Sequence, residues 1–194
     1  PYLLQPLSEG ADLVIHSATK YIGGHSDVTA GVLVGKKEWI EKARTKVVTL
    51  GCNLSPFEAW LTCRGLKTLS VRMERQSKNA EALAKALKNN SGVAKVFYPE
   101  NLSTKGNGAM VSIELAEHVD VEKFFQSLDW VKIAPTLAGV ETTVSYPLRT
   151  SHRSIPEETR VKLGITAGVV RISVGIEDER DIIEAFTNAI RSSN

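Results

Sequence analysis

The sequence has few cysteines, and the two present, Cys52 and Cys63, stand apart from any cluster of histidines. A structural zinc site needs about four Cys or His ligands at close spacing, so this pattern argues against one. With 2 cysteines in 194 residues, a disulfide framework is not expected either. The cysteine content fits a reducing compartment, and we expect a cytoplasmic protein.

Runs of like charge and long apolar stretches are also missing. The 24 basic and 22 acidic residues are interspersed and give a net charge of +2, so neither nucleic acid nor a membrane surface is expected as a partner. Every apolar stretch is far shorter than the roughly 20 residues that a membrane-spanning helix needs. With 42% hydrophobic residues the chain can form a core, and we expect an ordinary soluble protein.

Apolar patterning predicts helices and strands that are mixed to the end of the chain. Strands are expected at residues 13–15, 30–34, 93–98, 110–115, 131–134 and 169–174, and surface helices at 36–46, 121–128, 156–163 and 181–190. In the first of these helices Trp39, Ile40 and Ala43 should point inward. Ser154, three residues before Glu157, predicts the cap of the helix at 156–163. The second half therefore indicates an α+β domain with an antiparallel sheet.

A long helical region is predicted in the middle of the chain. Ser55, with Pro56 after it and Glu58 three residues on, forms a capping box, and Gly65 should weaken or bend the helix that follows. From Leu69 an amphipathic stripe continues to residues 89–92, through Met73, Ala80, Leu83, Ala84 and Leu87. A helix of this length can connect two domains.

The most informative stretch follows the apolar run at residues 13–15, which predicts a buried strand. Two hydroxyls and an amine, Ser17, Thr19 and Lys20, come at its exit and precede a glycine pair. Because α/β folds place ligands at strand exits, the hydroxyls could hold a phosphate while the amine reacts. Loops of this composition are also common as solvated connections.

A second interpretation of the same stretch is a serine acyl enzyme, since residues 17–20 read Ser-Ala-Thr-Lys and fit the S-x-x-K pattern. That motif needs a helix, which Gly23 and Gly24 would interrupt after barely a turn. The companion S-D-N and K-T-G elements are absent as well. The acyl-enzyme interpretation is therefore disfavoured.

The last predicted strand carries an arginine. Alternation places Arg171 and Ser173 on one face and Val170, Ile172 and Val174 on the other. An arginine there suits bidentate capture of a carboxylate, and it equally suits the solvated face of a half-buried sheet.

Residues 16–34, HSATKYIGGHSDVTAGVLV, resemble the cofactor-lysine segment of the Cys/Met-metabolism (trans-sulfuration) family of pyridoxal-phosphate enzymes. Further blocks resemble this family in the same order, at residues 54–60 with 64–69, 137–142 and 171–178. The family includes cystathionine γ-synthase, γ-lyase and β-lyase, methionine γ-lyase and homoserine-ester sulfhydrylase. The resemblance implies part of the α/β fold called fold type I, which is aspartate-aminotransferase-like. Residues 1–60 would be the C-terminal part of the large cofactor domain, 61–90 a connecting helix and 91–194 the small C-terminal domain.

The resemblance also implies roles for six residues. Lys20 would bind pyridoxal 5'-phosphate covalently and then act as a general base at the substrate α-carbon. Ser17 and Thr19 would hold the phosphate, and Arg171 would clamp the substrate α-carboxylate, helped by Thr136 and Leu137. No metal is implied.

The loop around Thr136 departs from the family pattern Ser-Leu-Gly-Gly at Thr136 and at Ala138. Pro135 stands where cystathionine γ-synthases and γ-lyases often carry a glutamate, which puts cystathionine as the preferred substrate in doubt. His152 follows Ser151 where the family usually has Thr-His, and no catalytic role is assigned to it.

The resemblance implies a carbon–sulfur lyase that acts on cystathionine or a related thioether by α,β- or α,γ-elimination. The alternative is γ-replacement, as in cystathionine γ-synthase or an O-acyl-homoserine sulfhydrylase. A homodimer or homotetramer is implied for the full-length enzyme. The family is about twice as long as this chain, and its pyridine-nitrogen aspartate lies upstream of Pro1. We therefore expect a truncated product that is inactive alone, and a non-catalytic fragment that only folds and self-associates is the alternative of another class.

Overall fold

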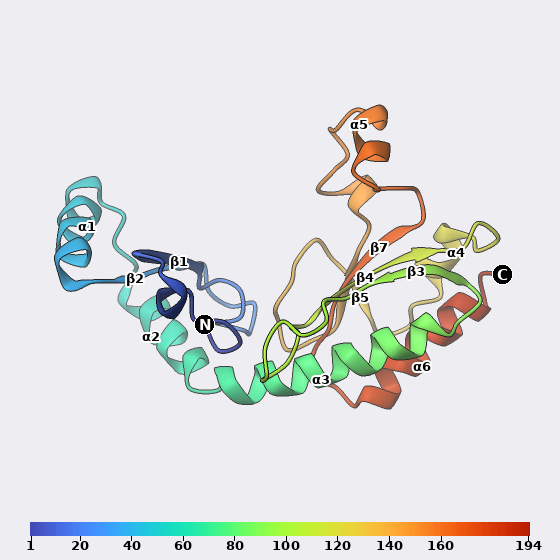
Figure 1. Ribbon diagram of the computed structural model, residues 1–194, viewed down its shortest axis with the longest axis horizontal. Helices are drawn as coiled ribbons and strands as arrows, with labels where there is room; N and C mark the ends of the chain where they lie inside the picture. The colour runs from blue at the N-terminus through green and yellow to red at the C-terminus, as the bar shows by residue number, and fades with distance from the viewer. The chain divides into compact units, whose positions relative to one another are not determined.

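The computed structural model describes residues 1–194 and divides into two compact units, Pro1–Met73 and Glu74–Asn194. The division falls inside α3 (Leu69–Lys88), the long helix in the middle of the chain (Figure 1). The predicted domain limits at residues 60 and 90 stay predictions. None of the helices combines the length and the apolar character needed to cross a membrane.

The first unit contains a two-stranded ribbon and two helices. Its elements are the 3₁₀ turn η1 (Pro6–Glu9), β1 (Leu13–Ser17), β2 (Gly31–Gly35), α1 (Lys37–Leu50) and α2 (Pro56–Leu66). β1 and β2 pair antiparallel, with His16 opposite Val32. The N-cap half of the capping box is confirmed, because the Ser55 hydroxyl accepts a hydrogen bond from the backbone N–H of Glu58 at 3.3 Å. The Glu58 carboxylate accepts from the Ser55 hydroxyl at 3.0 Å rather than from the Ser55 N–H.

Two expectations for the first unit are wrong. The strand at residues 13–15 forms but is not buried, since Leu13 is 41% and Ile15 79% exposed, and β1 pairs with a strand on one edge only. Trp39 does not point inward either and is 43% exposed. Its ring lies under the Lys42 ammonium at 4.6 Å, a contact that a solvated helix surface allows. Apolar patterning places these residues in elements, but burial needs a covering layer.

The second unit is a five-stranded sheet with helices, and its strands lie in the order β3-β4-β7-β6-β5. The strands are β3 (Val93–Phe97), β4 (Met110–Leu115), β5 (Lys132–Ile133), β6 (Thr143–Ser145) and β7 (Val169–Ser173). Besides α3, the helices of this unit are α4 (Val121–Gln126), α5 (Glu157–Lys162) and α6 (Glu179–Arg191). A 3₁₀ turn, η2 (Pro147–Arg149), follows β6. All neighbours pair antiparallel except β5 and β6, which are parallel.

Two details of this unit differ from the sequence expectations. The sequence does not predict β6, because it has three residues, two of which are Thr and Ser, and so shows no apolar alternation. All three residues are nevertheless buried, and β6 pairs with β5 and β7. Ser154 does not cap α5, whose first turn is preceded by Pro156 with no side-chain hydrogen bond. The locked φ of proline sets the entry to the helix there instead.

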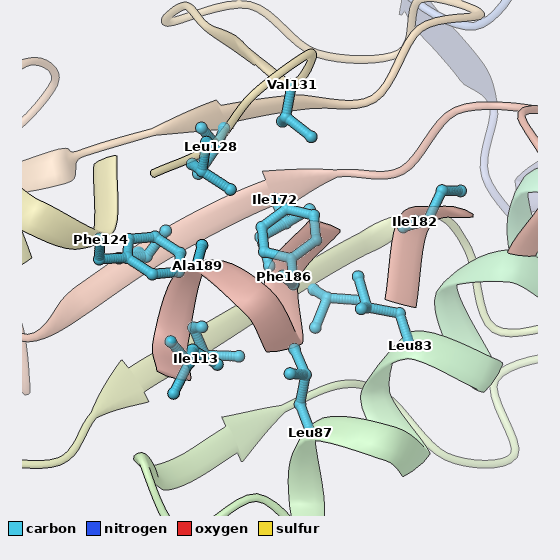
Figure 2. Packing of buried hydrophobic residues seen from close by; sticks show 14 of the residues in the cluster. Leu83, Leu87, Ile113, Phe124, Leu128, Val131, Ile172, Ile182, Phe186 and Ala189 are labelled. Atoms are coloured by element: carbon cyan, nitrogen blue, oxygen red, sulfur yellow. The ribbon is translucent and has the colours of Figure 1, made fainter. Parts of the chain in front are cut away.

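The core of the second unit lies between the sheet and the helices α3, α4 and α6 (Figure 2). Leu83 and Leu87 of α3 are fully buried, as the amphipathic stripe predicted. Phe186 of α6 and Phe124 of α4 meet with ring centroids 6.3 Å apart. This packed layer makes one face of β7 apolar and leaves the opposite face for polar side chains.

Candidate active site

The six predicted site residues fall into two groups, one in each unit. Lys20 follows β1 in a turn that hydrogen bonds close tightly, because the Gly23 N–H donates to the Ala18 carbonyl at 2.8 Å and the Gly24 N–H to the Lys20 carbonyl at 2.7 Å. Ala18 and Ile22, on either side of Lys20, are buried. The Lys20 side chain is half-buried, and its amine makes no hydrogen bond or ion pair in the chain. The turn therefore fixes the backbone of Lys20 while its amine stays available.

The two hydroxyls before Lys20 differ in their surroundings. Ser17 is exposed at the end of β1 and its hydroxyl has no partner in the chain. The Thr19 hydroxyl instead accepts a hydrogen bond from the Ala30 N–H at 3.0 Å and donates to the Ala30 carbonyl at 3.4 Å. Ser17 can thus donate to an anion directly, whereas Thr19 must release its long bond to Ala30 to do so.

Arg72 of α3 binds backbone carbonyls of the Lys20 turn. The sequence does not predict this role for Arg72. Its guanidinium donates to the carbonyls of Tyr21 (2.8 Å), Ile22 (3.4 Å) and Gly65 (2.9 Å). Arg72 is 4% exposed, and burial lowers the pKa of its guanidinium. The available signal was an arginine placed inside the apolar stripe of α3, where a charge needs partners.

The glycines beside this turn are explained by close approach. A Cβ on Gly24 would lie 2.0 Å from an Arg72 terminal nitrogen, and one on Gly65 would lie 2.1 Å from the Gly23 carbonyl oxygen. Gly65 was expected only to weaken a helix, but its main role is to let α2 touch the Lys20 turn. Burial also raises the pKa of Tyr21, next to Lys20, to about 12, so its phenol stays neutral near neutral pH.

The second group is built on β7. The Arg171 Nε donates to the Ser145 hydroxyl at 3.1 Å, across the β6–β7 pair in which these two residues face each other. Val170 and Ile172 are fully buried on the other face, as the alternation predicted. Because only Nε is engaged, the two terminal nitrogens of Arg171 remain as a fork for a carboxylate.

The loop with Thr136 and Leu137 is attached to the same face of β7. The Ala138 N–H donates to the Ser173 hydroxyl at 2.8 Å, and Ser173 is two residues from Arg171 on its strand. Ala138 has φ +72°, a left-handed conformation that costs a non-glycine residue about 1–2 kcal/mol. The glycine in the family pattern suits this conformation, so the departure at Ala138 keeps the loop shape at some cost. The structure therefore brings Thr136, Leu137 and Arg171 into one region.

Comparison with known proteins matches residues 1–191 to the family described as "Cys/Met metabolism PLP-dependent enzyme". The chain is 41% identical to cystathionine gamma-lyase of Bacillus subtilis (99% of this chain, 54% of the relative) and 40% identical to cystathionine beta-lyase of Lactococcus lactis (98% and 53%). It superimposes with a TM-score of 0.91 on cystathionine gamma synthase from Xanthomonas oryzae in complex with cystathionine, at 35% identity (99% and 53%). The chain thus spans about half the length of the relatives that it matches.

The donors around Lys20 fit the cofactor of this family. Pyridoxal phosphate has an aldehyde, which reacts with an amine that makes no other interaction, and a phosphate, which neutral hydrogen-bond donors can bind. The amine of Lys20 has no partner in the chain, and the exposed Ser17 hydroxyl stands three residues before it. The roles of the individual residues stay predictions.

The fold class is confirmed by the same comparisons, since the solved relatives share the mixed α/β architecture over nearly the whole chain. The mostly antiparallel sheet of the second unit and its helices are consistent with part of fold type I. With the family model matching 191 residues, this chain belongs to the Cys/Met-metabolism family of pyridoxal-phosphate-dependent enzymes.

Proposed function

We propose that this chain forms part of an enzyme that cleaves the carbon–sulfur bond of an amino-acid thioether, such as cystathionine, by α,β- or α,γ-elimination. The observation that carries the proposal is the unpartnered amine of Lys20, held at the exit of β1 by a hydrogen-bonded turn. When bound, pyridoxal phosphate supplies an electron sink that stabilises negative charge at the substrate α-carbon.

Lys20 has two tasks in this proposal. Its amine anchors the cofactor and, once the substrate amine has displaced it, takes the proton from the α-carbon at Nζ. For elimination at the γ-carbon, the same amine moves a second proton from the β-carbon. Ser17, and Thr19 after release of its bond to Ala30, hold the phosphate with neutral donors.

Arg171 orients the substrate in this proposal. Its Nε is held by Ser145, so the guanidinium plane is set before substrate arrives and the terminal nitrogens can bind both oxygens of the α-carboxylate. The backbone and the hydroxyl of the Thr136–Leu137 loop add contacts to the same carboxylate. A fixed carboxylate restricts the orientation of the substrate α-carbon.

The second candidate is γ-replacement, in which a thiol replaces the leaving group of a homoserine ester. The structural match to cystathionine gamma synthase supports it, and matches to cystathionine gamma-lyases with a TM-score of 0.92 support elimination equally. Pro135, which offers no side-chain donor or acceptor, favours neither candidate.

The first unit supports a further part of the proposal, that the chain alone is inactive. Ile15 on one face of the ribbon is 79% exposed. On the other face a cavity of about 530 Å³ is lined mainly by apolar side chains, such as Val14 and Val32, with His16 and Thr62 among them. Exposed apolar side chains on one face and a mostly apolar cavity on the other support the proposal that further polypeptide covers this ribbon. The non-catalytic fragment, which folds and self-associates without making product, is the competing description of the isolated chain.

The finer parts of the proposal concern assembly and location. We infer a homodimer or homotetramer for the full-length enzyme and a cytoplasmic location. Cys52 and Cys63 are exposed and unpaired, which suits a reducing compartment. Light scattering of the full-length protein tests the assembly.

The test of the proposal begins with borohydride reduction of the protein in the presence of pyridoxal phosphate, followed by intact mass and peptide mapping. We expect a pyridoxyl-phosphate adduct at Lys20 and none at Lys36, an exposed lysine that directly follows β2 and serves as the control. A protein of the relatives' length that carries this chain should release pyruvate or 2-oxobutyrate from cystathionine, and the ratio distinguishes β- from γ-elimination. Formation of cystathionine from a homoserine ester and cysteine, without either keto acid, would instead establish γ-replacement. Turnover by the isolated chain would contradict its predicted inactivity.

A further inference from the structure

Two amide side chains interrupt the apolar stripe of α3 in the second unit. Gln76 is 0% and Asn79 1% exposed, although both lie among the packed residues of the helix. Buried amides are retained where their hydrogen bonds matter, because each unpaired polar atom is costly away from water. Their partners therefore indicate what they do.

Gln76 joins the Thr136–Leu137 loop to the end of β7. Its Nε2 donates to the Gly139 carbonyl at 2.7 Å and to the Val174 carbonyl at 3.1 Å. Gly139 is three residues after Thr136, and Val174 is three residues after Arg171. One amide nitrogen thus fixes the distance between the two segments that carry the carboxylate-binding residues.

Asn79, one helical turn further along α3, holds the segment that follows β7. Its Nδ2 donates to the carbonyls of Gly175 at 3.1 Å and Glu177 at 2.9 Å. The Glu177 carboxylate in turn accepts from the hydroxyl of Thr142 at 2.8 Å, and that hydroxyl accepts from the Gly175 N–H at 2.9 Å. The loop is therefore linked to the end of β7 twice, once through Gln76 and once through Thr142 and Glu177, and both amides that bind these segments come from α3.

The acceptor oxygens of these amides contribute no hydrogen bond. Gln76 Oε1 and Asn79 Oδ1 are buried and accept no hydrogen bond from the chain. An apolar side chain of similar size would avoid the unpaired acceptor but would remove the donors to the backbone carbonyls. What the amides add is two donors each, aimed at four backbone carbonyls.

We propose that Gln76 and Asn79 are positioning residues, which hold the Thr136–Leu137 loop against β7 and so set the geometry at which Arg171 binds the substrate carboxylate. The inference rests on the proposed function for its substrate, but the holding of the loop is a property of this chain by itself. Neither residue touches the reacting atoms.

The test replaces Gln76 by methionine, which has nearly the same length and no donor. In the isolated chain, amide hydrogen exchange should rise about tenfold at residues 136–142 and 174–177, a factor within the range expected for losing the two hydrogen bonds that Gln76 donates. Exchange in β3 and β4 should stay unchanged. Gln126→Met, the same substitution at an exposed glutamine of α4, is the control.

In the longer enzyme, Gln76→Met should raise KM for the amino-acid substrate about tenfold and change kcat by less than about threefold, because the carboxylate is bound less well while Lys20 is unaltered. The borohydride adduct at Lys20 should form as in the parent protein. A merely structural role would reduce the amount of folded enzyme, and with it the apparent kcat, without moving KM.

The outcomes separate cleanly. Unchanged exchange at the two loops, a uniform rise that includes β3 and β4, or a local rise with unchanged KM would each overturn the inference. Asn79→Leu is the second variant, so a misfolded Gln76→Met protein does not end the test. If the longer parent protein forms no adduct at Lys20, the proposed function fails, while the exchange data still decide whether Gln76 holds the loop.

Discussion

The two units differ in how they hold a functional segment. The second unit has a contiguous core of nineteen buried apolar residues, and Arg171 stands on a strand whose other face belongs to that core. The first unit has a smaller cluster of four buried apolar residues, Ala18, Ile22, Val28 and Ala30, which lie around the Lys20 turn, and Leu69 and Met73 of α3 are buried as well. The residues of its ribbon are half-buried or exposed, and none is fully buried.

The turn that carries the proposed cofactor lysine, Lys20, is held by local contacts rather than by a large core. Backbone hydrogen bonds close the turn, Arg72 binds the carbonyls beneath it, and Gly65 allows direct contact with Gly23. The segments proposed to bind the substrate carboxylate are instead linked to a packed sheet through the amides of α3. The proposed cofactor lysine therefore lies in the unit with the smaller core.

The largest effect should come from Lys20→Ala. The variant should form no borohydride-stable adduct, and elimination by the longer enzyme should fall by roughly a thousandfold or more, because the covalent anchor and the base are one group. Mass spectrometry and keto-acid release measure the two losses. Lys36→Ala, at an exposed lysine, is the control, and an adduct that persisted in Lys20→Ala would refute the assignment.

The next effect concerns stability and tests the comparison directly. Phe186→Ala in the second unit should lower the free energy of unfolding by about 3–5 kcal/mol, since this fully buried ring leaves a cavity. Ile15→Ala in the first unit should change it by about 0.5 kcal/mol or less, because the side chain is 79% exposed in the isolated chain. Urea denaturation measures both values. Equal losses would show that the two units do not differ as described.

Arg171→Lys should have a smaller effect, confined to substrate binding. Lysine cannot keep the bond to Ser145 and also present a planar fork, so KM for the amino-acid substrate should rise about 10–100-fold, which corresponds to roughly 1.4–2.8 kcal/mol. Steady-state kinetics of the longer enzyme measure it, with Arg153→Lys, at an exposed arginine, as the control. An unchanged KM would remove Arg171 from the carboxylate site.

The smallest effect is the order in which acid destabilises the two units. Burial lowers the pKa of His16 in the first unit below its ordinary value of 6.5, so the unfolded state binds more protons as the pH falls below 6.5 and the unit loses stability. In the second unit, hydrogen bonds from Thr166 and Lys95 lower the pKa of Glu114 below 4.5. Its contribution is present above pH 4.5 and is lost only as the pH falls through the lowered pKa.

Hydrogen exchange followed from pH 7 to pH 4 should therefore show the first unit opening before the second. His16→Gln should remove the loss of stability of the first unit below pH 6.5. Glu114→Gln should reduce the loss of stability of the second unit below pH 4.5. Simultaneous opening of both units in the parent chain would contradict this order.

Several elements could be predicted from the sequence because their signals are local. The capping box at Ser55 and the stripe through Leu83 and Leu87 depend on residues three or four positions apart, which is within the reach of one helical turn. The alternation around Arg171 is similarly local. β6 was missed because its three residues are strand-like only between two neighbours.

The lysine segment, the placement of most helices and strands, and the resemblance to the family follow from local sequence patterns. The exposure of Ile15, the contact of Gly65 with Gly23, and the hydrogen bonds from buried polar side chains of α3 to the Lys20 turn and to the Thr136–Leu137 loop follow only from the fold. The physical reason is that these side chains bind backbone carbonyls about 50 to 100 residues away, as Arg72 binds Tyr21 and Asn79 binds Gly175. A carbonyl is common to every residue, so no pattern of side chains marks which one a buried donor will meet.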